Sequence, residues 1–168
     1  MITIKTAAPE DLDAVMAIYH YAQEFMIRSG NPNQWGRSFP ETDQIVEDIR
    51  QGICHVVMDT QIDDQIHGVF ALLDTPDPTY SVIDNGAWLN DDPYMTIHRI
   101  AQDGRLHELV PAVFEFVSSL CDNIRVDTYK DNLIMQHQVE KCGFVHCGTI
   151  YVRDHSPRLA YHWVKKKD

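Results

Sequence analysis

The stretch that decides the fold covers residues 94–128 and reads YMTIHRIAQDGRLHELVPAVFEFVSSLCDNIRVDT. Its first part, 94–101, is rich in apolar and β-branched residues, as in a strand, and the dipeptide Asp103-Gly104 after it favours a turn. Apolar residues then recur at three- and four-residue steps over 109–120, which indicates a helix, and 124–128 has the pattern of a second strand. A strand–helix–strand unit of this length predicts that its two strands pair in parallel.

The chain before this unit predicts two helices and three strands. Pro9 suits the first turn of a helix, whose apolar face then repeats as far as Met26. Thr42 is a good N-cap for a second helix, which Gly52 ends. Two apolar runs joined by a polar stretch follow, and they predict a hairpin. The predicted strands cover residues 2–4, 53–58 and 66–73.

The chain after this unit predicts a short helix at 132–141, ended by Gly143, and two last strands near 144–152 and 159–164. The complete order is β α α β β β α β α β β, which predicts an α/β (α+β) protein. We expect a mixed, mostly antiparallel sheet of six to seven strands with four helices on its faces. No repeat or linker interrupts the pattern, so we predict a single domain over residues 1–168.

The composition favours a cytoplasmic protein with an ordinary apolar core. Hydrophobic residues make up 44% of the chain, and no run reaches the ~20 apolar residues of a membrane helix. The first residues have neither the basic start nor the apolar stretch of a secretion signal. The formal net charge of −11 repels phosphate backbones and anionic lipids, so we expect no nucleic-acid partner and no membrane partner.

The cysteines and histidines favour neither a disulfide framework nor a metal site. The four cysteines form no C-x-x-C pair, and they suit buried apolar positions in a reducing compartment. On a strand, His146 and Cys147 would point to opposite faces and could not bind one ion together. We therefore expect no metal, and a metal-dependent hydrolase would lack its ligand cluster.

Two motifs resemble those of the GNAT N-acetyltransferase superfamily. The segment from Asn132 to Phe144 is similar to the family's N-x-x-A-x-x-x-Y-x-x-x-G-F segment. Ile100, Arg105 and Val110 have the spacing of the family's V-x-P-x-x-R-G-x-G-x-G turn. The order of elements agrees with the family over nearly the whole chain. Three stretches also resemble a bacterial subgroup whose substrates are largely undefined: GNPNQW at 30–35, TIHRIA at 96–101 and DNLIMQ at 131–136.

The resemblance implies that acetyl-CoA binds as the acetyl donor. In the family, the strand before the long helix pairs with the pantetheine arm, and the turn after it presents backbone N–H groups to the pyrophosphate at a helix N-terminus. The residues implied to bind the donor are Ile100, Ala101, Arg105, Leu106, His107, Glu108, Leu109, Val110 and Asn132. Asn132 has a second interpretation as a simple helix cap.

Several positions differ from the family pattern, among them Met135 at the place of a small alanine, and three of them bear on function. Glu108 and Val110 stand where the turn has glycines, which let the backbone approach a phosphate without a Cβ in the way. Val139 stands where a tyrosine often protonates the leaving thiolate. These replacements keep an alternative open, in which the protein is a catalytically degenerate member of the fold that binds a small ligand or a protein.

His98 and Tyr94 are the candidates for proton transfer. Histidine suits general-base catalysis near neutral pH, and strict strand alternation would place His98 on one face with Tyr94, Thr96 and Ile100. The alternative for His98 is a structural role in the core or on the surface. A tyrosine is a poor base at neutral pH, so we expect Tyr94 to order a water or to contact the substrate.

The candidates for contact with the acceptor lie at the end of the first helix and in the irregular connections. Aromatic side chains in loops often line pockets, and they can equally cover the edge of a core. The candidates are Glu24, Phe25, Trp35, Tyr80 and Trp88. Glu24 also fits the interpretation of a solvated helical acid.

The sequence therefore predicts an N-acetyltransferase that transfers an acetyl group from acetyl-CoA to the amine of a small molecule or an amino-acid-like acceptor. The acidic net charge favours a cationic acceptor. Dimers are common in this fold, so a homodimer is a further expectation from the resemblance.

Overall fold

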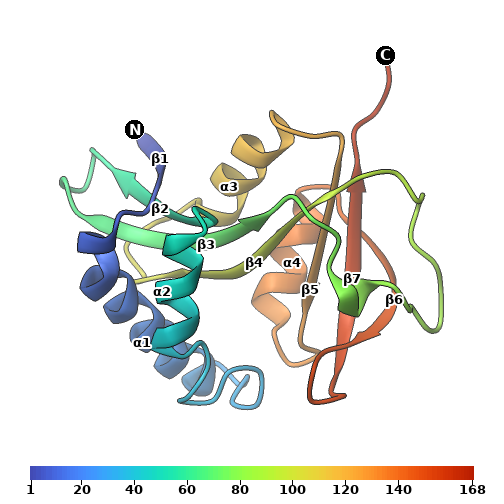
Figure 1. Ribbon diagram of the computed structural model, residues 1–168, viewed down its shortest axis with the longest axis horizontal. Helices are drawn as coiled ribbons and strands as arrows, with labels where there is room; N and C mark the ends of the chain where they lie inside the picture. The colour runs from blue at the N-terminus through green and yellow to red at the C-terminus, as the bar shows by residue number, and fades with distance from the viewer. The chain divides into compact units, whose positions relative to one another are not determined.

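The computed structural model describes residues 1–168 and has the order of elements that the sequence predicts (Figure 1). Seven strands form one sheet in the order β1-β2-β3-β4-β5-β7-β6. The strands are β1 Ile2–Thr6, β2 Cys54–Asp59, β3 Ile66–Leu73, β4 Met95–Gln102, β5 Asn123–Thr128, β6 Val145–Tyr151 and β7 Pro157–Val164. The helices are α1 Leu12–Arg28, α2 Thr42–Arg50, α3 Leu109–Ser118 and α4 Leu133–Lys141, with short 3-10 turns η1 Pro9–Asp11 and η2 Pro78–Tyr80.

The predicted fold class is confirmed, including the parallel pairing of the two strands that flank α3. β4 and β5 run parallel, with Met95 opposite Ile124 and Thr96 opposite Arg125. The predicted hairpin of β2 and β3 is antiparallel, and β5, β6 and β7 also pair in antiparallel fashion. The sheet is therefore mixed and mostly antiparallel, with four helices.

The chain divides into two compact units, and each is built around its own core. The first unit comprises Met1–Leu72 and His98–Val113, and the second comprises Leu73–Ile97 and Phe114–Asp168. None of the helices combines the length and the apolar character that crossing a membrane requires.

In the first unit, α1 and α2 lie side by side, α2 contacts β2, and the three elements share one buried core (Figure 1). The apolar stripe of α1 produces this packing, because its residues at three- and four-residue steps face the same side. Burying one such valine or isoleucine side chain stabilises the fold by roughly 1.5–3 kcal/mol. The buried core residues are Ala7, Val15, Met16, Ile18, Tyr19, Ala22, Ile45, Ile49, Cys54, Val56, Val69 and Ala101.

In the second unit, two sets of aromatic and aliphatic side chains form the core, with members from β6 and β7. Phe114 contacts both Phe144 and Trp163 edge to face, with ring centroids 5.8 and 5.1 Å apart. The other set surrounds the buried Tyr80, Ile150 and Ala160, and it includes the partly buried Ile83, Trp88, Tyr94 and Val152. The irregular connection before β4 is therefore part of this core.

Two helix starts differ from the sequence prediction. Pro9 opens a 3-10 turn, so α1 begins at Leu12, and the Asp11 carboxylate accepts a hydrogen bond from the Ala8 N–H at 2.8 Å. Thr42 is the first residue of α2 and not its N-cap, because the extended residue before the helix is Glu41, with φ −76° and ψ 153°. Both differences amount to a shift of the predicted start within one turn.

Candidate active site

The connection between β4 and α3 carries most of the residues that the resemblance assigns to the donor. Asp103 shapes its first turn, because its Oδ1 accepts a hydrogen bond from the Arg105 N–H at 3.0 Å. Gly104 has a φ of +85°, and a Cβ at this position would lie 2.5 Å from the Tyr21 hydroxyl oxygen. Only glycine fits this turn without displacing Tyr21.

Two leucines fix the second half of this connection on β3. The side chains of Leu106 and Leu109 are buried and cover Gly68, where an added Cβ would lie 3.0 and 2.9 Å from their methyl groups. Between them, His107 and Glu108 are exposed.

The N-terminus of α3 has the free backbone donors that an anion can use. The Glu108 carbonyl accepts the first helical hydrogen bond from the Ala112 N–H at 3.0 Å. The amides at the start of a helix have no partner within it, and the helix dipole makes this end positive. Pro111 removes one donor from the first turn, so Leu109 and Val110 are the remaining helical amides there.

β4 contains an irregular residue that the sequence pattern does not indicate. Arg99 has a φ of +51°, which is rare for a residue with a Cβ. Strict alternation therefore does not run from His98 through to Ile100, and Tyr94 precedes the strand, so the predicted common face is wrong for this segment. Ile100 is half-buried, and Ala101 belongs to the buried core beside α1.

The conformation of Arg99 is fixed by two partners in the same unit. Its guanidinium forms a bidentate ion pair with the buried Asp48, at 2.8 and 3.0 Å. Its carbonyl accepts a hydrogen bond from the Tyr19 hydroxyl at 2.8 Å. Burial raises the pKa of Tyr19 well above its ordinary value, so this hydroxyl stays protonated and remains a donor.

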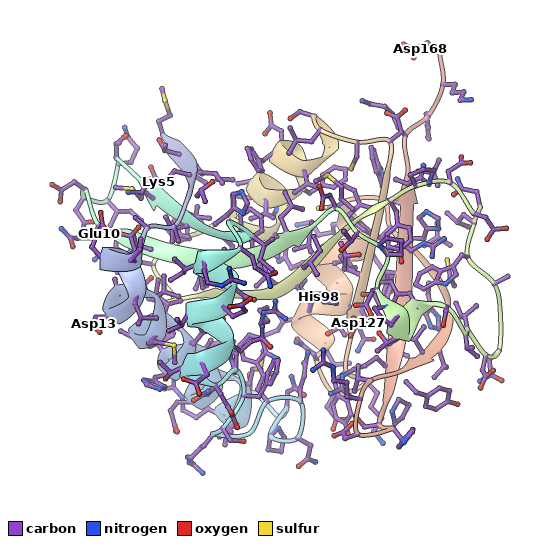
Figure 2. All side chains as sticks on the ribbon, in the orientation of Figure 1. Lys5, Glu10, Asp13, His98, Asp127 and Asp168 are labelled. Atoms are coloured by element: carbon purple, nitrogen blue, oxygen red, sulfur yellow. The ribbon has the colours of Figure 1, made fainter.

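Of the two residues predicted to transfer protons, His98 lies in β4 and is half-buried (Figure 2). Tyr94 lies just before that strand, and its hydroxyl accepts a hydrogen bond from the Asp77 N–H at 3.0 Å. The Tyr94 ring stacks on that of Tyr80, with 6.2 Å between the ring centroids. The side chain of Tyr94 is therefore well ordered within the second unit.

Arg125 is a buried cation that the sequence reasoning missed. The Arg125 side chain lies between two aromatic rings, with its guanidinium carbon 4.2 Å from the ring centroid of Trp88 and 4.1 Å from that of Tyr94. Its Nη2 donates a hydrogen bond to the Asn90 carbonyl at 2.8 Å. Arg125 is only 5% exposed, so it joins Trp88, Asn90 and Tyr94 into one ordered segment.

Tyr80 and Trp88, two of the predicted acceptor contacts, are linked to each other. The Trp88 indole N–H donates to the Tyr80 carbonyl at 2.9 Å, and the two ring centroids are 5.2 Å apart. The Tyr80 hydroxyl donates to Asp127 on β5 at 2.6 Å. Burial and the nearby Asp127 carboxylate raise the pKa of Tyr80 well above its ordinary value.

The other predicted acceptor contacts lie in the first unit. Glu24 forms an exposed ion pair with Arg37 at 2.8 Å. Phe25 is exposed and lines a hollow of about 340 Å³ with Tyr21, Arg28 and Ser29. Trp35 is half-buried and packs edge to face on Tyr19, with ring centroids 5.8 Å apart.

Asn132 caps α4, as one of its two interpretations predicts. Its Oδ1 accepts a hydrogen bond from the Met135 N–H at 3.0 Å. At the other end of the helix, Gly143 has a φ of +94°, which is the left-handed conformation expected there. Val139, which replaces the family's tyrosine, is 2% exposed and packs in the core.

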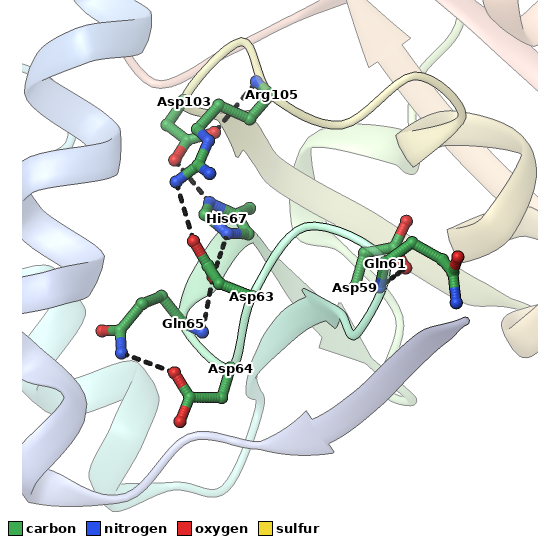
Figure 3. Close-up of polar contacts among 8 residues, drawn as sticks. All are labelled: Asp59, Gln61, Asp63, Asp64, Gln65, His67, Asp103 and Arg105. Atoms are coloured by element: carbon green, nitrogen blue, oxygen red, sulfur yellow. Dashed lines mark hydrogen bonds and ion pairs between the residues drawn. The ribbon is translucent and has the colours of Figure 1, made fainter.

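A second charged network lies at the start of β3. Figure 3 shows the His67 ring between the carboxylates of Asp63 and Asp103, with Arg105 reaching Asp63. In the sequence, the signal for this network is that His67 stands within an otherwise apolar run. The signal for Arg125 is likewise that a charged residue stands within the buried strand β5. Their partners could not be deduced, because Asp103 and Asn90 are 36 and 35 residues away along the chain.

The comparisons with known proteins agree on the fold. No protein-family model matches the sequence. No curated protein matches it either. A GNAT-family acetyltransferase from Streptococcus agalactiae is 28% identical, with a TM-score of 0.82, and the match covers 99% of this chain and 96% of that one.

More distant solved structures share the fold over the same length. A GNAT-family acetyltransferase from Listeria monocytogenes is 17% identical, with a TM-score of 0.72 and coverage of 97% of this chain and 94% of that one. A protein from Salmonella typhimurium, solved with its cofactor acetyl-CoA, is 12% identical, with a TM-score of 0.59 and coverage of 99% and 95%. The chain therefore has the fold of the GNAT-family acetyltransferases along its whole length.

Proposed function

We propose that the protein is an N-acetyltransferase that uses acetyl-CoA to acetylate the amine of a small molecule or an amino-acid-like acceptor. The observation that carries the proposal is the likeness of the whole chain to a GNAT-family acetyltransferase, at 28% identity and a TM-score of 0.82. A more distant relative in fold was solved with acetyl-CoA, which supports the same donor here.

The β4–α3 connection is the proposed site for the donor pyrophosphate. Leu109 and Val110 supply first-turn amides at the positive end of α3, and the half-exposed Arg105 supplies a cation. The side chain of Glu108 is exposed, and we propose that its carboxylate turns to solvent and leaves the backbone N–H groups accessible. Ile100, Ala101, Leu106, His107 and Asn132 complete the proposed donor contacts.

The proposed reaction is a direct attack of the acceptor amine on the thioester carbonyl. A C–N bond forms, the C–S bond breaks, and CoA leaves as a thiolate, which is a tolerable leaving group because thiols have a pKa near 8.5. The amine proton passes to a base, for which we propose His98, directly or through a water. Tyr94, positioned by Arg125 and Tyr80, is proposed to order that water or the substrate.

The acceptor is proposed to be an amine, and the predicted aromatic contacts are separate candidates in each unit. Phe25 and Trp35 are the candidates in the first unit. Trp88 is the candidate in the second unit, where the buried Tyr80 can only support Trp88 from behind. The net charge of −11 favours a cationic molecule. Glu24 already pairs with Arg37, so an ammonium group would have to displace that exposed arginine. Exposed ion pairs of this kind contribute little free energy, so replacing Arg37 by an ammonium group would cost little free energy.

The test is an acetyl-transfer assay over a panel of amines, measuring release of the CoA thiol and the mass of the acetylated product. We expect His98→Gln to lower kcat about 10²-fold or more if His98 is the base. His20→Gln removes an exposed histidine of α1 and serves as the matched control with unchanged kcat. Equal rates for His98→Gln and the wild type would exclude His98 as the base.

A second candidate function is supported by the residues that replace the family's motif. Val139 is buried where a tyrosine is common, and Glu108 and Val110 stand at two glycine positions. A non-catalytic protein of this fold would bind a small ligand or a protein through the same surfaces. It would release no CoA thiol with any amine, even where acetyl-CoA binds.

A further inference from the structure

His67, in β3, is almost completely buried and contacts two carboxylates. Its Nδ1 lies 2.7 Å from Asp103 Oδ2, and its Nε2 lies 2.7 Å from Asp63 Oδ1 (Figure 3). The residue is 1% exposed, so water does not mediate either contact. Two such short contacts are both hydrogen bonds only if both ring nitrogens carry a proton. With both carboxylates ionised, this geometry requires the imidazolium form of His67. The hydrogen bonds from the Gln65 N–H and from His67 lower the pKa of Asp63 and so favour its ionised form.

The charges around the ring agree with that protonation state. Burial lowers the pKa of His67, but the hydrogen bonds and charges of Asp103 and Asp63 raise it more, and the net result is a raised pKa. Asp59 on β2 adds a further negative charge nearby. Arg105, the one cation that faces the same carboxylates, approaches Asp63 Oδ2 with its Nη1 at 3.0 Å.

These contacts link four residues, which we call the His67 network: His67, Asp63, Asp103 and Arg105. Asp103 has three roles in it, since its Oδ2 accepts from His67, its Oδ1 accepts from the Arg105 N–H, and its own N–H donates to the His67 carbonyl at 3.0 Å. Asp63 Oδ1 also accepts from the Gln65 N–H at 2.8 Å. When His67 is protonated, the positive charges of His67 and Arg105 balance the negative charges of Asp63 and Asp103.

We propose that His67 is a positioning residue, whose imidazolium form holds the 103–105 turn and Arg105 in the arrangement that receives the anionic donor. The role in donor binding rests on the proposed function. When His67 loses its proton, one nitrogen presents a lone pair to a carboxylate, and this contact becomes repulsive. The turn then loses a hydrogen bond, and the network gains one negative charge close to the proposed pyrophosphate site.

The direction of the pH dependence follows from the raised pKa. The 103–105 turn is fully ordered at pH values below the ordinary pKa of histidine. It loses this order as the pH rises through the higher pKa of His67 in the folded protein. An extra unit charge about 10 Å from a phosphate, in a medium of intermediate dielectric, weakens binding about three- to tenfold. Acetyl-CoA affinity should fall by this factor over the same pH range.

The first experiment tests the network without any ligand. NMR titration of the His67 ring should give a midpoint above the ordinary value for histidine, and Asp103→Asn should lower that midpoint. In His67→Gln, which carries no charge, the amides of Gly104 and Arg105 should exchange faster than in the wild type. An ordinary midpoint, or unchanged exchange in the variant, would overturn the proposal.

The second experiment tests the link to the donor by titrating acetyl-CoA calorimetrically from pH 6 to pH 9. The wild type and the control His20→Gln should lose affinity across the midpoint of His67, and His67→Gln should bind with an affinity that does not change over this range. A wild-type affinity independent of pH overturns the link. Failure of the wild type to bind acetyl-CoA at any pH would contradict the proposed function, while the ligand-free titration still decides whether His67 orders the turn.

Discussion

Two buried histidines have opposite protonation states, because their partners differ. His67 faces two carboxylates, whereas His162 on β7 faces an amide oxygen and a backbone N–H. The Leu89 N–H donates to His162 Nδ1 at 3.1 Å, so the ring proton lies on Nε2 and is donated to Asn123 Oδ1 at 2.9 Å. This pairing requires the neutral imidazole.

His162 gives a prediction about stability in acid. Burial lowers the pKa of His162 to about 4, and the positive charge of Arg125 contributes to the shift. The unfolded chain takes up this proton near pH 6.5, so the contribution of His162 to stability is present above that pH and is lost as the pH falls toward 4. We expect a loss on the order of 2–3 kcal/mol from this group.

The measurement is urea unfolding of the wild type and His162→Gln at several values between pH 4.5 and 7.5. The variant should be less stable at neutral pH, and the difference between the two proteins should shrink as the pH falls. His20→Gln, at an exposed position, should follow the wild type throughout. A difference that is the same at every pH would contradict the neutral, buried state of His162.

Single residues also show which parts of the candidate site could be predicted from the sequence and which could not. The residues proposed to bind the donor at 105–110 were found from their spacing, because the motif is local. Arg99, Arg125 and His67 were missed as functional candidates, since each depends on partners brought together only by the fold. Asp48, the partner of Arg99, lies 51 residues away along the chain. A charged residue within an apolar strand was the available signal at Arg125 and His67, but it does not name the partner.

At the scale of elements, the helices and strands were predicted well because their patterns are periodic. β3 matches its predicted range, and the starts of β1 and α3 and the ends of β5, α4 and β7 also fall where the sequence places them; the other ends shift by one to a few residues. β4 is the exception in its interior, where Arg99 interrupts the alternation with its positive φ. No propensity argument predicts this conformation, because the ion pair with Asp48 and the bond from Tyr19 stabilise it.

The start of α4 gives a prediction that separates the two interpretations of Asn132. Asn132→Ala should destabilise the protein by about 1 kcal/mol through loss of the cap, whereas Asn132→Ser keeps an N-cap oxygen and should be nearly neutral. If the side chain also contacts the pantetheine arm, both variants should weaken acetyl-CoA binding. Thermal unfolding measures the loss of stability, and calorimetric titration with acetyl-CoA measures the effect on binding. Normal binding by the serine variant would leave Asn132 as a cap alone.

At the scale of the whole molecule, the order of elements and the mixed sheet follow from the sequence, and the strand order β5-β7-β6 does not. One edge of β5 pairs with β4, and on pattern alone either strand of the final hairpin could pair with the other edge. In the structure β7 does so, with Asn123 opposite Val164. The single domain over residues 1–168, the homodimer and the cytoplasmic location stay predictions.

The central claim is that acetyl-CoA is the donor, and calorimetric titration of the wild-type protein with acetyl-CoA tests it most directly. Glu108→Gln removes the negative charge at the proposed pyrophosphate turn, and Glu115→Gln removes one from an exposed position farther along α3 as the control. We predict a Kd in the micromolar range, tightened about two- to fivefold in Glu108→Gln and unchanged in Glu115→Gln. No heat up to millimolar acetyl-CoA, repeated at a second temperature, would contradict the account.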